Sequence, residues 1–312
     1  MKIFKFGGAS VKDAESVKNV AKILQSEGTE YTLVVISAMG KITNAFEDVV
    51  TAYYNKTDEL SEKLGVIEDF HKNLMNDLFD VNDDIYREVE ILLGELSWFL
   101  ARNTSRRFNY VYDQIICFGE LLSTRIISAY LSKSGINNNW FDVRNYIKTD
   151  SNYRDAKVDW DLTQDIISNK IDASKLNITQ GFIAANDTEN TTTLGREGSD
   201  YTAGIFAYCL NADNVTIWKD VPGVLNADPR VFSDTTLLEQ ISYEEAIEMA
   251  FYGASVIHPK TLQPLERKEI PLLVRSFVNP QETGTKVSKG TRLVPYIPCF
   301  IVKKNQILVS IS

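Results

Sequence analysis

The chain has 312 residues, of which 44% are hydrophobic, so it can form one large globular domain or two smaller ones. Its 33 Lys and Arg residues are outnumbered by 42 Asp and Glu residues, which gives a formal net charge of -9. Non-specific affinity for nucleic acid comes mostly from neutralised phosphates, so we expect no nucleic-acid partner.

The first half of the chain predicts two strand–turn–helix units followed by long helices. Residues 3–6 form an apolar run typical of a strand, and apolar residues at i, i+3, i+4 and i+7 from Val17 indicate a helix. Residues 31–40, YTLVVISAMG, predict a buried strand, and helical spacing resumes in residues 41–56. A long helical stretch is expected from about residue 60 to residue 132, with Gly135 ending its last helix.

The second half alternates between strands and helices. The strands are expected at 139–147, 176–186, 214–220 and 271–277, and the helices at 159–170, 195–212, 243–251 and 261–268. A Thr-rich stretch before residue 195 is expected to be a loop. This alternation predicts an α/β fold with a mostly parallel central sheet and helices on both faces.

The two ends of the chain carry further expectations. Residues 299–302 and 307–311 predict two strands of a hairpin, and an isolated hairpin is marginally stable, so we interpret them as the start of a further domain. The first residues lack the features of a secretory signal, and no apolar run approaches the roughly 18 residues of a membrane span. We therefore expect a cytoplasmic protein without membrane contact.

Cysteine and histidine are sparse. Cys117, Cys209 and Cys299 lie in apolar contexts, which favours buried free thiols over disulfides. His71 and His258 lack the partner spacing of a structural zinc site, so we expect no metal site built by the protein.

Two glycine-containing turns are the candidate ligand-binding sites. KFGGAS, at residues 5–10, lies between a predicted strand and a helix, where free backbone N–H groups and the helix dipole favour an anion. GREGSD, at residues 195–200, opens a second helix. The chain has no GxxxxGK[ST], no GxGxxG after a strand, and no HRD or DFG pair, so the common phosphate-binding motifs are absent. Two such turns can face each other across the carboxyl ends of one sheet.

These motifs resemble those of the aspartokinases, which belong to the amino acid kinase family. KFGGAS is similar to the family signature KFGGTS, and VISAMGKITN, CFGE, TLGREGSDYTA, WKDVPGVLNADPR and YGASVIHP follow in the family's order. The resemblance covers the chain from Lys2 to about Pro295. It implies a three-layer amino-acid-kinase-like sandwich in residues 1–294. Residues 295–312 are then a linker and the first strands of a truncated regulatory, ACT-like domain.

The resemblance implies phosphoryl transfer from ATP to the side-chain carboxylate of L-aspartate. The products are 4-phospho-L-aspartate and ADP, in the first step of the pathway to lysine, threonine and methionine. A carboxylate is already ionised at neutral pH, so the nucleophile needs no general base. Bringing two anions together requires cations, helix N-termini and Mg²⁺. We expect the Mg²⁺ ion to be held mainly through the nucleotide phosphates. A homodimer is also implied.

The resemblance assigns roles to individual residues. Lys5 neutralises charge on the transferred phosphoryl group, and Asp200 orients the lysines there, although its position at a helix start is also typical of an N-cap. The expected contacts to the amino acid are an ion pair from Arg196 to a carboxylate, an ion pair from Glu120 to the α-ammonium, and hydroxyl contacts from Thr43 and Ser199. The nucleotide contacts implied are Lys5, Gly7, Gly8, Lys219, Asp220, Leu225, Asp228, Arg230, Ser255 and Val256.

The chain departs from the family pattern in the motifs themselves. Ala9 replaces a Thr, Glu197 replaces a Gly, and Leu225 stands where Tyr is common. The usual second lysine is Ser255 here, and Lys219 or Lys260 could supply the missing charge.

Two alternatives to an active aspartokinase remain open. One is a non-catalytic regulatory protein of the same fold that binds nucleotide or amino acid, which Ser255 favours and the retained Lys5, Asp200, Arg196 and Glu120 oppose. The other is a kinase for a different acidic amino acid.

Overall fold

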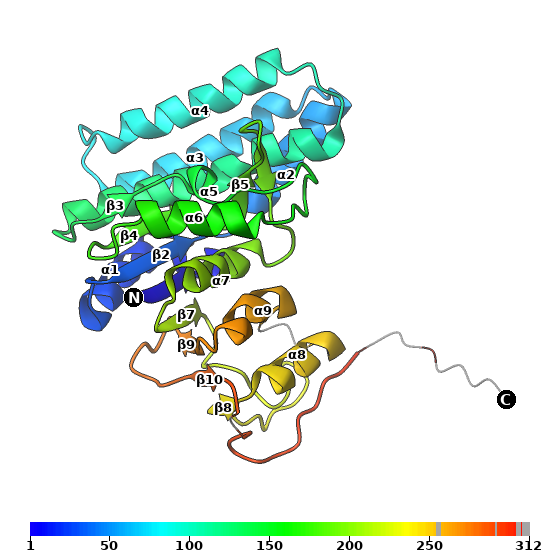
Figure 1. The fold of residues 1–312 in the computed structure, drawn as a ribbon. Coiled ribbons are helices and arrows are strands. Elements are labelled where there is room, and N and C mark those ends of the chain that lie inside the picture. Colours follow the sequence, from blue (N-terminus) through cyan, green and yellow to red (C-terminus); the bar gives the residue numbers. More distant parts are fainter. Residues whose placement is uncertain (254–256, 291, 304–306, 308–312) are drawn as a thin grey trace.

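A mostly parallel sheet forms the centre of the computed structural model, which describes residues 1–253, 257–290, 292–303 and 307 (Figure 1). In this part of the chain the sheet has eight strands in the order β3-β4-β2-β1-β7-β9-β10-β8, and β10 runs antiparallel to β9. The strands are β1 (Lys2–Phe6), β2 (Thr32–Ile36), β3 (Asn139–Trp140), β4 (Asn177–Gln180), β7 (Asn214–Lys219), β8 (Gln240–Ile241), β9 (Leu272–Ser276) and β10 (Thr285–Val287). A separate antiparallel pair consists of β5 (Ile183–Ala185) and β6 (Thr191–Thr193).

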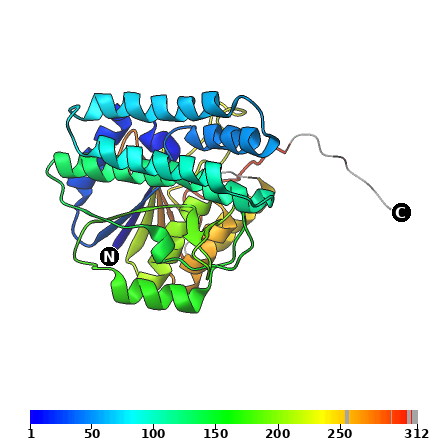
Figure 2. The same cartoon turned by 90° about the horizontal axis from the view of Figure 1, so that it is seen from above.

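Helices cover both faces of this sheet (Figure 2). One layer contains α1 (Ala14–Glu27), α2 (Ile42–Asn55), α3 (Leu60–Leu78), α4 (Ile85–Arg102) and α5 (Phe108–Lys133), with α5 packed on β2, β3 and β4. The other contains α6 (Trp160–Lys170), α7 (Gly198–Leu210), α8 (Tyr243–Tyr252) and α9 (Pro259–Arg267), with α7 packed on β1, β2 and β7. Two short 3-10 helices are η1 (Gly8–Val11) and η2 (Val143–Asn145). The predicted three-layer α/β architecture is confirmed.

Helix α5 is the main helix of the core. It is long and apolar enough to cross a membrane by length and composition, with a mean hydropathy of 1.3, but 78% of that window is buried inside the fold. Burial against the sheet on one side and against α2 and α4 on the other explains its apolar composition.

Several predicted element boundaries were wrong. Only Asn139–Trp140 of the predicted strand 139–147 pairs with β4, because the chain turns into η2, where the Asp142 side chain accepts a hydrogen bond from the Arg144 N–H. The predicted strand 176–186 is split at Gly181, where a Cβ atom would lie 2.5 Å from the Cβ of Ser199. The Thr-rich stretch expected to be a loop contains β6. The long helical stretch is confirmed and consists of three helices, α3, α4 and α5.

The predicted hairpin at the end of the chain is only partly described. Residues 299–302 do not form the expected strand, although Phe300 makes an isolated parallel bridge with Ala227. Residues 304–306 and 308–312 lie outside the described residues, so the second strand and the domain division at 294/295 remain predictions.

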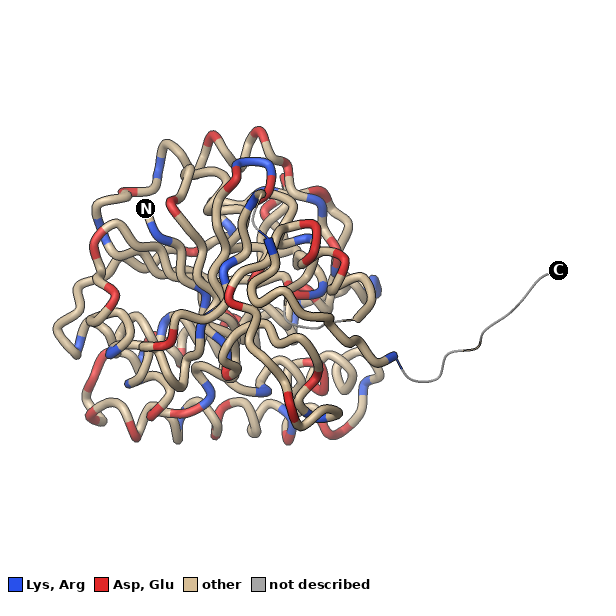
Figure 3. The backbone as a smooth tube through the Cα atoms, turned by 90° about the horizontal axis from the view of Figure 1, so that it is seen from below, with Lys and Arg blue, Asp and Glu red and all other residues tan. Residues whose placement is uncertain are grey.

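Charged residues of both signs are interspersed along the backbone (Figure 3). Cys117 and Cys209 are buried and Cys299 is partly buried, all as free thiols. Among the described residues, no group of three or more His, Cys, Asp or Glu side chains is placed to hold a metal ion.

Candidate active site

The parallel strands bring the turns after β1, β2 and β7 to one edge of the sheet. Residue 5 in β1 is level with Val35 in β2 and Ile217 in β7, so the turns after these strands start side by side. The turn after β1 contains Gly8, where a Cβ atom would lie only 2.8 Å from the carbonyl oxygen of Gly40 and 2.9 Å from that of Ala38. A side chain at position 8 would therefore separate this turn from the turn after β2. The site lies at the carboxyl ends of the strands, where ligands of open α/β sheets bind.

A buried carboxylate between two lysines lies at this edge. The Asp200 Oδ1 atom is 2.6 Å from Lys5 Nζ, and Asp200 Oδ2 is 3.6 Å from Lys219 Nζ. Asp200 is fully buried, while the side chains of Lys5 and Lys219 are 9% and 20% exposed. Burial opposes ionisation of Asp200, but the positive charges of Lys5 and Lys219 outweigh it and hold the pKa of this carboxyl below its ordinary value. The group carries one negative and two positive charges, a net positive charge available to an anion.

Asp200 is not the N-cap of α7. Glu197 occupies the N-cap position, and Asp200 lies in the first turn with its side chain directed at the lysines. The alternative interpretation of Asp200 as a capping residue is therefore wrong. Its place near the positive end of the helix dipole adds to the stabilisation of its charge.

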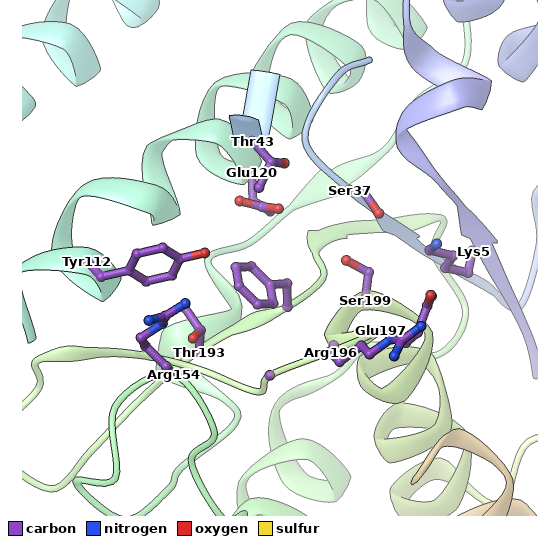
Figure 4. Close-up of a pocket in the computed structure, with 13 residues that line it drawn as sticks. Lys5, Ser37, Thr43, Tyr112, Glu120, Arg154, Thr193, Arg196, Glu197 and Ser199 are labelled. Carbon is purple, nitrogen blue, oxygen red and sulfur yellow. The ribbon is translucent and has the colours of Figure 1, made fainter. Parts of the chain in front are cut away.

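The predicted substrate residues line one cavity of about 380 Å³ beside this ion-pair group (Figure 4). Its walls come from β1, the β2–α2 turn and the start of α2, α5, the loop after η2, the β4–β5 turn, β6, and the turn that leads into α7 with the start of that helix. The lining residues are Lys5, Ser37, Thr43, Tyr112, Glu120, Arg154, Phe182, Thr193, Gly195, Arg196, Glu197, Gly198 and Ser199. Lys5 and Arg196, 191 positions apart in the sequence, therefore share one cavity, together with Thr43, Glu120 and Ser199.

Glu120 presents an incompletely paired carboxyl group to the cavity. It projects from α5 and is 3% exposed; its Oε1 accepts a hydrogen bond from the Ala38 N–H at 3.4 Å, and its Oε2 has no hydrogen-bond partner among the described residues. Burial raises the pKa of Glu120 to about 8. A buried carboxyl group without a cation is suited to a ligand that brings its own positive charge, such as the ammonium of an amino acid.

Several lining residues were not predicted from the sequence. Ser37 directly follows β2, so the small-residue turn there was an available signal. Tyr112 and Thr193 lie in elements that the sequence marks only as helix and loop, and Arg154 lies in an irregular loop, so no sequence pattern pointed to them. Glu197 has a φ of 54°, a left-handed conformation that favours glycine, which explains the Gly that the family pattern has at this position.

The predicted nucleotide residues are only partly brought to the cavity. Lys219 does not line the cavity, but its Nζ lies 3.6 Å from Asp200 Oδ2 at the cavity edge. The residues Asp220, Leu225, Asp228 and Arg230 are also absent from the lining. Arg230 forms a two-bond ion pair with Asp228, at 3.0 Å and 2.8 Å, and Leu225 bridges to Leu237. Ser255 and Val256 lie outside the described residues.

Lys260, one of two candidates to replace the missing lysine, is engaged elsewhere. Its Nζ donates to Asp155 Oδ1 and to the Leu194 carbonyl oxygen, both at 2.8 Å. Lys219 is the candidate whose ammonium lies beside Asp200.

Comparisons with known proteins agree with this fold. The model of the amino acid kinase family matches residues 1–276. The chain is 35% identical to lysine-sensitive aspartokinase 3 of Escherichia coli, covering 99% of this chain and 69% of that protein. It is 32% identical to the chloroplastic bifunctional aspartokinase/homoserine dehydrogenase of Daucus carota, covering 99% of this chain and 35% of that protein. The chain therefore belongs to the amino acid kinase family, where its relatives are aspartokinases.

A solved structure supports the same conclusion. The crystal structure of E. coli aspartokinase III in complex with aspartate and ADP has a TM-score of 0.84 and 35% identity, covering 94% of this chain and 65% of that one. The predicted resemblance to the aspartokinases and the predicted fold are confirmed. The chain spans about two thirds of these aspartokinases and about one third of the bifunctional relatives.

Proposed function

We propose that the protein is an aspartate kinase domain that transfers the γ-phosphoryl group of ATP to the side-chain carboxylate of L-aspartate. The observation that carries the proposal is the Lys5–Asp200–Lys219 group at the edge of a cavity that also contains Glu120 and Arg196. The relative whose crystal structure contains aspartate and ADP supports both substrates.

Charge complementarity is the physical basis of the proposal. Aspartate carries two carboxylates and one ammonium, and the cavity offers cations at Lys5 and Arg196 and an acceptor at Glu120. The ammonium is assigned to Glu120, because this buried carboxyl forms no ion pair with any described residue, and Thr43 and Ser199 add hydroxyl contacts. The substrate carboxylate is then directed at Lys5, where its negative charge and that of the phosphoryl group are neutralised.

The ATP phosphates are assigned to the Gly7–Gly8 turn and to the two lysines. A Cβ atom on Gly7 would lie 3.2 Å from Lys5 Nζ, so the backbone of this turn and the ammonium are adjacent. Asp200 orients both lysines, and the carboxylate attacks the γ-phosphorus in line while ADP departs. The more exposed residues Asp220, Leu225, Asp228 and Arg230, with Ser255 and Val256, are assigned to the rest of the nucleotide.

Mg²⁺ fits this arrangement as a partner of the nucleotide. Asp200 is already paired with two lysines, and the described residues contain no carboxylate cluster that could hold a metal. The ion is therefore assigned to the ATP phosphates, where it would supply positive charge to offset that of the phosphates.

The remaining parts of the proposal rest on the resemblance. They are a role in lysine, threonine and methionine biosynthesis, a cytoplasmic location, a homodimer, and a regulatory domain beginning after residue 294. Phe300, in the segment that we assign to the start of that domain, packs on Phe232 with 5.9 Å between the ring centroids.

The test is an assay of ADP release together with hydroxylamine trapping of the acyl phosphate. We expect both signals with L-aspartate, little signal with glutamate or N-acetylglutamate, and loss of both signals in Lys5→Met. Signal with glutamate or N-acetylglutamate but not aspartate would favour a kinase for another acidic amino acid. Nucleotide binding without ADP release would favour the non-catalytic alternative.

A further inference from the structure

Arg154 lines the same cavity from a loop that the sequence did not mark as functional (Figure 4). Its guanidinium carbon lies 4.3 Å from the ring centroid of Tyr112 and 5.7 Å from that of Phe108. The Tyr112 ring is itself fixed, because its hydroxyl donates a 2.8 Å hydrogen bond to Glu47. The aromatic face therefore forms a platform that orients the flat guanidinium group.

The backbone of Arg154 is held in an unusual conformation. Its φ of 73° is in the left-handed region, which is unfavourable for a residue with a side chain. The Arg154 N–H donates to Asp113 Oδ2 at 3.0 Å, and Asp113 also accepts from the N–H and the hydroxyl of Thr193, both at 2.9 Å. Asp113 is completely buried. One buried carboxyl thus fixes two residues of the cavity wall, Arg154 and Thr193.

The positive charge of Arg154 is not neutralised by a carboxylate in the described part of the protein. Its side chain forms no ion pair there, whereas Lys5 is paired with Asp200. In Figure 4, Lys5 and Arg196 lie on one side of the cavity and Arg154 lies across it with Tyr112 and Thr193; Glu120 lies between the two sides. An amino acid with two carboxylates and a central ammonium presents its charges in the same order.

We propose that Arg154 is a specificity-determining residue that binds the α-carboxylate of the amino-acid substrate. The inference rests on the proposed function, since it takes the side-chain carboxylate to lie at Lys5 and the ammonium to lie at Glu120. Arg154 then completes a site for a dicarboxylic amino acid, and the guanidinium fork suits a carboxylate bound by two hydrogen bonds. Arg154 takes no part in the transfer itself.

The test compares wild type with Arg154→Gly and Arg154→Lys on two substrates, L-aspartate and L-aspartate α-amide. The amide keeps the ammonium and the side-chain carboxylate but lacks the charge that Arg154 is proposed to bind. Glycine accepts the φ of 73°, so the loop should keep its conformation. Lys56→Gly is the matched control, because it removes an exposed cation with a φ of 56° that lies outside the cavity lining.

We expect Arg154→Gly to raise the KM for aspartate about 10- to 100-fold, the range of a lost charge-assisted hydrogen bond, with an intermediate effect in Arg154→Lys. The KM for ATP should stay within about twofold, as should every constant of Lys56→Gly. The preference for aspartate over the α-amide, as a ratio of kcat/KM, should fall by at least about tenfold.

The inference is overturned if the KM for aspartate is unchanged in Arg154→Gly. It is also overturned if that KM rises while the aspartate-to-amide ratio keeps its wild-type value, because the loss is then structural. Failure of the proposed function has a different signature, since wild type would then release no ADP with aspartate.

Discussion

The raised pKa of Glu120 makes aspartate binding dependent on pH. Glu120 must be ionised to pair with an ammonium, yet burial raises its pKa to about 8, so most of the free protein holds this carboxyl protonated at neutral pH. Binding of aspartate should therefore release a proton. The KM for aspartate should fall as the pH rises toward 8 and then level off.

The size of this effect follows from the ionised fraction. With a pKa of about 8, the KM is multiplied by about 100 at pH 6, about 10 at pH 7 and about 2 at pH 8, relative to its limit at high pH. The assay is the initial rate of ADP release over pH 6 to 8.5 with saturating ATP and varied aspartate. Glu120→Gln should give a high KM that does not change with pH, and the KM for ATP serves as the internal control.

The same shift has a consequence for stability. The folded protein binds this proton more tightly than the unfolded chain, so the ionisation of Glu120 lowers stability as the pH rises from about 4.5 to about 8. Glu120→Gln should therefore melt at a higher temperature than wild type near pH 8, with a smaller difference in acid. A wild-type KM for aspartate that is constant from pH 6 to 8, or a Glu120→Gln variant with the wild-type profile, would refute the reasoning.

Four further predictions concern the lysines, Asp200, Glu197 and regulation. If Lys219 replaces the missing lysine, Lys219→Met should lower kcat about 100- to 1000-fold. Lys260→Met should change kcat by less than about tenfold, and equal effects of the two substitutions in steady-state kinetics would contradict the assignment. Asp200→Asn should lower the free energy of unfolding by about 3 to 5 kcal/mol, because it leaves two lysines without their buried counter-charge. A denaturation midpoint equal to that of wild type would argue against the pairing. Glu197→Gly should stabilise the protein by up to about 1 kcal/mol and lower the KM for aspartate. The control Glu189→Gly, at another left-handed position outside the cavity lining, should affect stability alone, and a lower KM in both variants would count against a role of Glu197 in the cavity. Lysine and threonine should not inhibit this chain, and saturable inhibition by either in the same assay would show that residues 1–312 already contain a feedback site.

The main elements and part of the site could be predicted from local patterns. Alternating strands and amphipathic helices indicate the parallel sheet, because hydrophobic spacing depends on local geometry alone. The glycine turn at Gly7 and Gly8 and the residues Lys5, Arg196 and Asp200 were identified because they lie in short motifs. Boundaries were less accurate where a tertiary contact decides them, as at Gly181, where Ser199 packs too closely for a side chain.

Only the tertiary structure decided how the charges combine. Asp200 could be an N-cap or an ion-pair partner, and the packing of α7 on β1 and β7 determines that it contacts Lys5 and Lys219. Arg154 enters the site because the buried carboxyl of Asp113, 41 positions earlier, holds its loop against the cavity wall. Sequence patterns report short-range geometry, whereas burial, pairing and the pKa of a carboxyl depend on which distant segments meet, and that information exists only in the folded chain.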